Sequence, residues 1–218
     1  MKGVLVLEDG SVVEGLAFGA RKTVFGELVF NTSMTGYCEA LTDPSYKGQM
    51  LMMTYPLIGN YGVDPSTFES QQIQPLGFVV RERCKVPSHA SSKMSLEEFL
   101  LANDTPGIEN VDTRRLTIKI RVHGTMKACL STEEHDANEL IEKVKAMPPP
   151  EKSNLVGLVT CKDIIHHRSA NGKRKVVVID CGVKGSIIRG MRRFCDVIQV
   201  PYDLSEDDIS ALKPDGII

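Results

Sequence analysis

The sequence lacks tryptophan, a continuous run of 18 apolar residues and any excess of basic charge. Without such a run, we expect no segment to cross a membrane. Lys and Arg together number 26 and Asp and Glu 28, so the formal net charge is -2 and the composition does not indicate a nucleic-acid-binding protein. The N-terminus has neither an apolar core region nor a small-residue cleavage site, and we therefore expect no secretory signal.

The spacing of cysteine and histidine does not match a metal site. The adjacent His166 and His167 point in different directions, so we interpret them as part of a solvated loop. Cysteines in a chain without a secretory signal are typical of the reducing cytoplasm, where we place this protein. No C-x-x-C pair, the usual metal-binding spacing, occurs among the cysteines, which are Cys38, Cys84, Cys129, Cys161, Cys181 and Cys195.

Residues 1–150 combine short apolar runs with frequent turn signals. The run Val4–Leu7 ends at Glu8-Asp9-Gly10, which favours a β-hairpin. Helices are predicted from Ser95 onward, from Asp112 to Arg121 and from Glu133 to Met147. We therefore expect residues 1–150 to form an α+β N-terminal domain rich in β-strands.

The remaining sequence predicts a linker and then a different architecture. Pro148-Pro149-Pro150 ends the preceding helix, and the polar residues 151–174 are interpreted as a linker. Val176–Ile179 is a continuous apolar run, typical of a strand buried on both faces. A helix over Ser186–Phe194, with Phe194 on its apolar side, precedes further strands. We expect residues 175–218 to begin an α/β doubly wound, flavodoxin-like sheet.

The most informative segment is Phe30–Tyr46, FNTSMTGYCEALTDPSY, together with YPLIGNYG at Tyr55–Gly62. These motifs place many neutral hydroxyl and amide groups in an apolar region, which suits a small zwitterion or a tight protein contact better than a phosphate or a metal. Asp43-Pro44 is a turn signal that presents the Ser45 hydroxyl just after the turn. Each of these groups also fits an ordinary role in satisfying turn backbone.

Both motifs resemble the N-terminal domain of the small, glutamine-hydrolysing subunit of carbamoyl-phosphate synthetase. The resemblance continues in VLVLEDGSVVEGLAFGA near the start, VDTRRLT at Val111–Thr117 and KVVVIDCGVKGSIIRGM at Lys175–Met191. It departs at Cys38 and over residues 131–172. Residues 175–218 resemble the first part of a class I glutamine amidotransferase domain.

This resemblance implies a heterodimer in which glutamine is hydrolysed and the ammonia passes to a large, ATP-using subunit. That partner would make carbamoyl phosphate for arginine and pyrimidine synthesis and hold ATP and its metal ions, so no cofactor is expected in this chain. The family nucleophile is a Cys on a G-x-C-x-G elbow, a pattern absent from these 218 residues. We assign no catalytic residue and expect the chain alone to be inactive.

In relatives, the serine of the D-P-S-Y turn touches bound glutamine, which makes Ser45 the expected glutamine-binding residue. Gly36, Tyr37 and Asn60 are expected to be architectural. Two alternatives remain open: a non-catalytic docking module that binds the large subunit, and an unrelated flavodoxin-like binding protein. The second is favoured by the C-terminal pattern alone and not by the first 130 residues.

Overall fold

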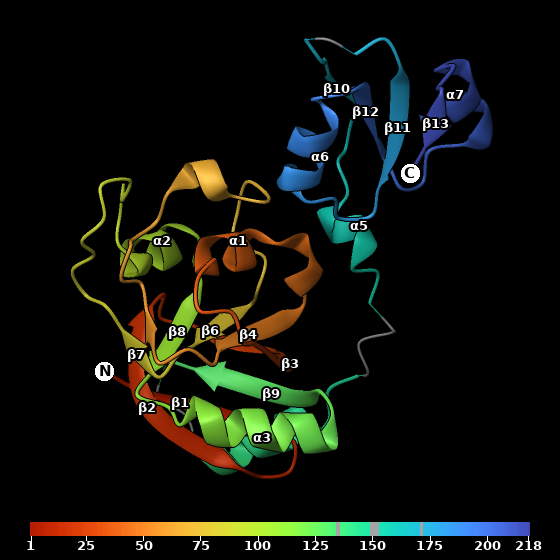
Figure 1. Cartoon of the computed structure of the whole chain (residues 1–218). Helices are drawn as coiled ribbons and strands as arrows, with labels where there is room; N and C mark the ends of the chain where they lie inside the picture. The colour runs from red at the N-terminus through yellow and green to blue at the C-terminus, as the bar shows by residue number, and fades with distance from the viewer. Residues whose placement is uncertain (134–135, 149–152, 171) are drawn as a thin grey trace. The chain divides into compact units, whose positions relative to one another are not determined.

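A computed structural model describes residues 1–133, 136–148, 153–170 and 172–218 (Figure 1). Its contacts divide the chain into two compact units, Met1–Lys152 and Ser153–Ile218. Strands dominate the first unit and helices accompany them, so the predicted α+β character of the N-terminal part is confirmed. The expected helix end at Pro149-Pro150 and the linker positions 151, 152 and 171 lie outside the described residues.

The strands of the first unit close into a barrel in the order β1-β2-β8-β6-β4-β3-β9. The hairpin of β1 and β2 turns at Gly10, with φ 85°, as the Asp-Gly signal predicts. Parallel pairing joins β4 to β3 and to β6, and β6 to β8, whereas the other neighbours are antiparallel. The bounds are β1 (Lys2–Leu7), β2 (Val12–Gly19), β3 (Thr23–Asn31), β4 (Gln49–Met53), β6 (Gly77–Val79), β8 (Pro106–Glu109) and β9 (Met126–Ser131).

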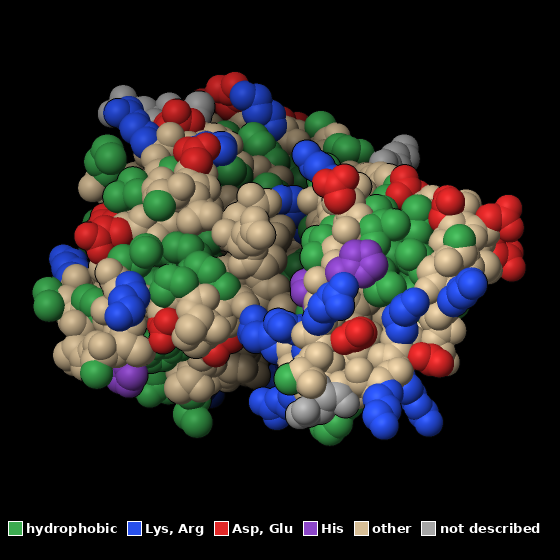
Figure 2. All heavy atoms as spheres, turned by 90° about the horizontal axis from the view of Figure 1, so that it is seen from above, with side chains coloured by type: hydrophobic (Ala, Val, Ile, Leu, Met, Phe, Trp, Pro, Cys, Tyr) green, Lys and Arg blue, Asp and Glu red, His purple; other side chains and the backbone are tan. Residues whose placement is uncertain are grey.

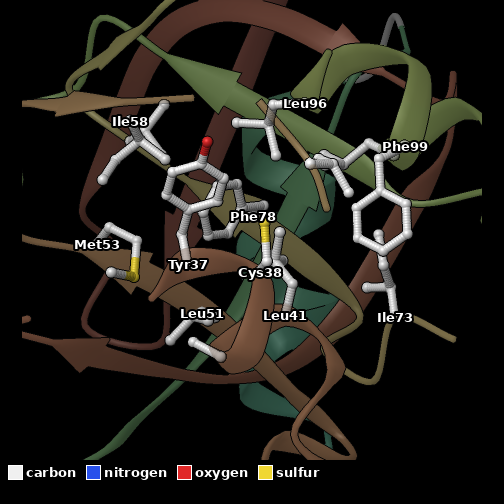
Figure 3. Close-up of a cluster of buried hydrophobic side chains, with 14 of the residues drawn as sticks. Tyr37, Cys38, Leu41, Leu51, Met53, Ile58, Ile73, Phe78, Leu96 and Phe99 are labelled. Atoms are coloured by element: carbon white, nitrogen blue, oxygen red, sulfur yellow. The ribbon is translucent and has the colours of Figure 1, made fainter. Parts of the chain in front are cut away.

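Strand β4 separates two hydrophobic cores because successive side chains of a strand point to opposite faces. Met50 and Met52 pack in one cluster with residues of β1, β3 and β9. Leu51 and Met53 pack in the other cluster, beside residues of α1 (Tyr37–Thr42) and α2 (Leu96–Ala102) (Figure 3). The second core therefore attaches α1, and the turn that follows it, to the barrel.

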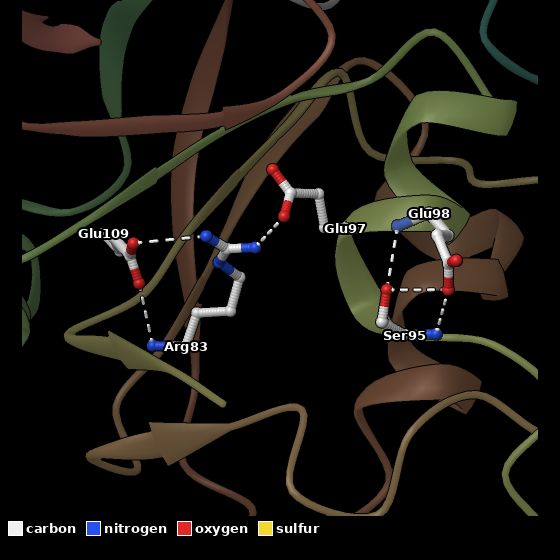
Figure 4. A network of polar contacts seen from close by, with 5 residues as sticks. All are labelled: Arg83, Ser95, Glu97, Glu98 and Glu109. Atoms are coloured by element: carbon white, nitrogen blue, oxygen red, sulfur yellow. Dashed lines mark hydrogen bonds and ion pairs between the residues drawn. The ribbon is translucent and has the colours of Figure 1, made fainter. Parts of the chain in front are cut away.

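Three described helices of the first unit begin at polar side-chain caps. Ser95 and Glu98 form a capping box at α2, with the Ser95 N–H donating to Glu98 Oε2 at 2.7 Å (Figure 4). Asp112 Oδ1 accepts from the N–H of Arg115 and caps α3 (Thr113–His123). The third helix, α4 (Ala137–Lys145), starts later than predicted because Asp136 caps it; residues 134–135 of the predicted helix lie outside the described part.

The second unit contains a sheet in the order β10-β12-β11-β13. Strand β11 (Lys175–Asp180) pairs in parallel with β12 (Asp196–Pro201) and with β13 (Gly216–Ile217). The connections between them carry α6 (Gly185–Met191) and α7 (Glu206–Ala211), as a βαβαβ pattern requires. Strand β10 (Ile165–His167) adds an antiparallel edge to β12.

Two sequence interpretations of this unit need correction, that of His166 and His167 and that of Phe194. His166 and His167 lie in β10 and not in a loop, because the strand pairs with Val197 and Ile198. A short helix, α5 (Val156–Val159), precedes β10. Phe194 is 78% exposed because α6 ends at Met191, before the helical pattern reaches it.

Two short 3₁₀ turns and one small strand pair complete the first unit. The turns are η1 (Pro44–Tyr46) and η2 (Pro65–Thr67), and β5 (Leu57–Ile58) pairs with β7 (Glu82–Arg83). In the part of the chain that the structure describes, no helix has the length and apolar character to cross a membrane. Basic and acidic side chains are interspersed with hydrophobic ones over the face seen in Figure 2.

Candidate functional site

Ser45 lies in η1, on a turn whose backbone is held by a buried carboxylate. Asp43 is only 7% exposed, and its Oδ1 accepts from the Ser45 N–H at 2.9 Å. Pro44 occupies the first position of the turn, where its fixed φ is already suitable. Ser45 itself is exposed, so its hydroxyl is accessible to a ligand.

The helix before this turn is fixed at its C-terminal end through Thr42. This residue is fully buried, and its hydroxyl donates to the carbonyl of Cys38 at 2.8 Å while accepting from the N–H of Glu69 at 2.9 Å. The Ser70 hydroxyl donates to the Thr42 carbonyl at 2.6 Å. These bonds join α1 to the segment after η2, so the approach of the chain to Ser45 is fixed.

The N-terminal end of α1 depends on a distant tyrosine. Gly36 occupies the cap position with φ 86° and has no side chain to cap the helix. The Tyr61 hydroxyl instead accepts from the N–H groups of Gly36, at 2.7 Å, and Tyr37, at 3.1 Å. Tyr37 lies fully buried among the hydrophobic side chains of the core (Figure 3). Its hydroxyl donates to the Gly62 carbonyl at 2.5 Å.

These contacts give Gly36 and Tyr37 a structural role. Burial raises the pKa of the phenols of Tyr37 and Tyr61, which keeps both hydroxyls protonated and able to hydrogen-bond. Asn60 is exposed, and its backbone carbonyl accepts from the Ser88 N–H at 3.1 Å. The capping of α1 by Tyr61 was not predicted. Tyr37 and Gly36 lie 24 and 25 positions earlier in the chain, and no local spacing links them to Tyr61.

Three thiols, two of them buried and that of Cys161 partly buried, are poor nucleophiles. Burial raises the pKa of Cys38 to about 12, that of Cys129 to about 12 and that of Cys161 to about 11. Because the thiolate is the reactive form, these cysteines are unsuited to catalysis near neutral pH. Cys181 is exposed and directly follows β11. Among the described residues, no group of three or more His, Cys, Asp or Glu side chains is arranged to hold a metal ion.

A buried carboxylate in the second unit is structural as well. Asp180, at the end of β11, is 2% exposed. Its Oδ1 accepts from the N–H groups of Gly182 and Val183 at 2.9 and 2.8 Å. Its Oδ2 accepts from the Cys161 N–H and from Gln199 Nε2, both at 2.7 Å. With four donors already bound, Asp180 shapes the turn after β11. No local spacing links it to Cys161 or Gln199, so the sequence alone does not reveal these contacts.

The chemistry available at Ser45 is therefore binding. A hydroxyl on a fixed turn can donate a hydrogen bond to a carboxylate or accept one from an ammonium group, at a net value of about 1.5–3 kcal/mol for a charged partner. A serine hydroxyl becomes a nucleophile only beside a general base. The turn supplies an acceptor for the Ser45 backbone, Asp43 Oδ1, and presents the hydroxyl to solvent.

Comparison of the sequence with known proteins identifies the family of this chain. The family model described as carbamoyl-phosphate synthase small chain, CPSase domain, matches residues 5–130. The carbamoyl phosphate synthase small chain of Archaeoglobus fulgidus is 51% identical over 218 residues, covering 100% of this chain and 61% of that protein. The small chain of Methanocaldococcus jannaschii is also 51% identical, over 223 residues, with the same coverage.

A pyrimidine-specific small chain of Halalkalibacterium halodurans is 44% identical, covering 100% of this chain and 59% of that protein. Among solved structures, an aminopeptidase from Aneurinibacillus aligns with 13% identity over 95% of this chain and 54% of that one; its TM-score of 0.33 supports no argument. The chain thus spans 61% of the length of the first curated relatives that it matches. With matches of this extent and identity, the chain belongs to the family of carbamoyl-phosphate synthase small chains.

Proposed function

We propose that this chain is part of the small subunit of a glutamine-dependent carbamoyl-phosphate synthase. In this proposal the small subunit hydrolyses glutamine and supplies ammonia to a large, ATP-using subunit in the cytoplasm, for arginine and pyrimidine synthesis. The observation that supports it best is the 51% identity to a named small chain over all 218 residues. ATP and its metal ions are assigned to the large subunit.

Within this assembly, Ser45 is proposed to bind glutamine. Its support is the combination of an exposed hydroxyl and a backbone fixed by Asp43 on a turn that the barrel core holds in place. The chain's own contribution is then substrate binding and assembly with the large subunit, because none of the residues described above combines a nucleophile with a base.

The second unit, with residues 175–218 as its main part, is proposed to be the first part of a class I amidotransferase domain. The parallel pairing of β11 with β12 and β13, joined through α6 and α7, is consistent with such a doubly wound sheet. Domain bounds of 1–150 and 175–218 with a linker between them remain a proposal. The structure gives the alternative boundary at Lys152 and Ser153.

The test is Ser45→Ala in the complete small chain assembled with its large subunit. Loss of a hydrogen bond of about 1.5–3 kcal/mol should raise KM for glutamine by about 10- to 150-fold. The ammonia-dependent reaction bypasses glutamine binding and should keep its rate. Steady-state kinetics with the two nitrogen donors separates a glutamine contact from a general loss of stability, which would lower both activities.

The chain contains a matched control for this variant. Ser66 occupies the same position of η2, where Asp64 Oδ1 accepts from the Ser66 N–H at 2.9 Å. Ser66→Ala removes an exposed hydroxyl from the second Asp-Pro-Ser turn, η2, and should leave both activities unchanged. An unchanged KM in Ser45→Ala would reject the glutamine contact. If the assembled wild-type protein used ammonia and not glutamine, the alternative of a non-catalytic docking module would replace the proposal.

A further inference from the structure

The two Asp-Pro-Ser turns of the first unit share their local chemistry and differ in their anchorage. In η1 and in η2, the aspartate Oδ1 accepts from the serine N–H at 2.9 Å and proline occupies the first position. The residue after the serine is Tyr46 in η1 and Thr67 in η2. Any property that separates Ser45 from Ser66 must therefore come from what surrounds each turn.

Tyr46 connects η1 to the end of strand β3. Asn31 Nδ2 donates to the Tyr46 hydroxyl at 3.0 Å, and the Tyr46 ring packs, partly buried, against the core cluster beneath α1 and α2. In η2, the Thr67 hydroxyl donates to the Asp64 carbonyl at 2.9 Å, which is a bond within the turn. The hydroxyl of the residue that follows Ser45 thus accepts from a distant element of the barrel, whereas the hydroxyl of the residue that follows Ser66 donates within its own turn.

Asn31 is itself well fixed. It is the last residue of β3, where it pairs in register with Met53 of β4, and its carbonyl accepts from the Thr54 N–H at 3.0 Å. Its Oδ1 accepts from the Ser33 N–H at 2.8 Å, which orients the amide so that Nδ2 points to Tyr46. The Asn31 amide therefore links the end of strand β3 to the turn that carries Ser45.

We propose that Tyr46, held by Asn31, is a positioning residue that fixes the direction of the Ser45 hydroxyl toward the bound glutamine. This inference rests on the proposed function, because it needs Ser45 to contact glutamine. Asp43 fixes the turn on the N-terminal side of Ser45, and the Asn31–Tyr46 bond fixes it on the C-terminal side. A hydrogen bond to a small ligand weakens when its donor is misplaced by a fraction of an ångström, so both attachments matter for binding.

The test is Tyr46→Phe in the complete small chain assembled with its large subunit. The substitution keeps the buried ring and removes only the acceptor of the Asn31 bond. A neutral hydrogen bond contributes about 0.5–1.5 kcal/mol, so KM for glutamine should rise by about 2- to 10-fold, less than in Ser45→Ala. The value of kcat with saturating glutamine and the rate with ammonia should not change.

Two further variants separate positioning from stability. Tyr37→Phe removes a buried hydroxyl bonded to Gly62 and should lower stability without raising KM for glutamine. In an Asn31→Ala background, Tyr46→Phe should have no further effect on KM, because the bond is already absent. An equal effect of Tyr46→Phe in both backgrounds would overturn the inference, as would a parallel loss of the glutamine and ammonia activities.

Failure of this inference is distinguishable from failure of the proposed function. If Ser45→Ala raises KM for glutamine and Tyr46→Phe does not, the glutamine contact stands and the positioning role of Tyr46 is rejected. If neither variant changes KM, the contact between Ser45 and glutamine is rejected, and the positioning role is rejected with it.

Discussion

Tyr61 stacks on Tyr37, with ring centroids 4.2 Å apart and an interplanar angle of 22°. The same tyrosine accepts hydrogen bonds from the N–H groups of Gly36 and Tyr37, which are the first donors of α1. The preferred cap residues, Ser, Thr, Asp and Asn, accept from N–H groups of the first turn through their own side chains, but here the cap residue is glycine. The segments Phe30–Tyr46 and Tyr55–Gly62 are thus one structural unit, joined through this tyrosine pair.

Tyr61→Phe should lower the free energy of unfolding of the first unit by about 1–2 kcal/mol, because two helix N–H groups lose their acceptor. The ring stack on Tyr37 is retained, so the effect isolates the hydroxyl. Urea denaturation followed by circular dichroism measures the change. Tyr55→Phe is the control, since Tyr55 is 37% exposed and should tolerate the substitution. Equal stability of the two variants would show that water replaces the Tyr61 cap without cost.

Arg83 pairs through its guanidinium with two carboxylates, those of Glu97 and Glu109. Its side chain is 8% exposed and bonds to Glu97 and, at 3.4 Å, to Glu109, whose side chain is 11% exposed (Figure 4). The guanidinium also lies 4.8 Å from the centroid of the Phe18 ring. Glu109 additionally accepts from the Arg83 N–H at 3.1 Å, so this ion pair holds β7 beside β8.

Arg83→Met should lower the free energy of unfolding by about 3–5 kcal/mol, because it leaves Glu109 buried without its cation. Adding Glu109→Gln should restore part of that loss, since the uncompensated charge is removed. Glu97→Gln is the matched comparison. The Glu97 side chain is 43% exposed, so loss of its ion pair with Arg83 should lower the free energy of unfolding by no more than about 1 kcal/mol. If Arg83→Met were no more destabilising than Glu97→Gln, the buried pair would not be holding β7.

The parts of the fold that the sequence predicts are those with local causes. The Asp9-Gly10 hairpin and the caps Ser95 and Asp112 were recognised because a few neighbouring residues determine each of them. Closure of the barrel was not predicted. It depends on the pairing of β1 with β9, which joins Val4 to Ser131, and no short sequence pattern identifies the partner of a strand. Strand β10 was missed because its residues are polar or exposed and only pairing with β12 makes them a strand.

The candidate site divides in the same way. Asp43-Pro44-Ser45 predicts its own turn, including the bond from Asp43 to the Ser45 N–H. The support of that turn by Asn31 and the capping of α1 by Tyr61 depend on tertiary contacts between separate segments. Sequence spacing therefore predicts the turn, and the family resemblance identifies Ser45 as the candidate ligand group. The structure was needed to find the contacts of Asn31 and Tyr46 that are proposed to orient it.

The buried cysteines provide a test of the core that does not depend on any activity. Burial raises the pKa of Cys38 and of Cys129 from 9.0 to about 12 in each case. At pH 8 their thiolate fraction is then about 1,000-fold lower than that of an ordinary thiol, in addition to their steric protection. Cys181 is exposed and has no such protection from solvent.

With N-ethylmaleimide at pH 8, Cys181 should be labelled first and Cys38 and Cys129 only as the first unit unfolds, as peptide mass spectrometry can determine. A folded-state pKa above the unfolded value contributes stability that is fully present below pH 9 and is lost as the pH rises toward 12. Labelling of Cys38 and Cys129 should therefore accelerate across that pH range. Cys181→Ser should abolish the fast phase and leave the slow phase unchanged. Labelling of Cys38 as fast as Cys181 in the native protein would mean that α1 opens readily, which the contacts of Thr42 and Tyr61 oppose.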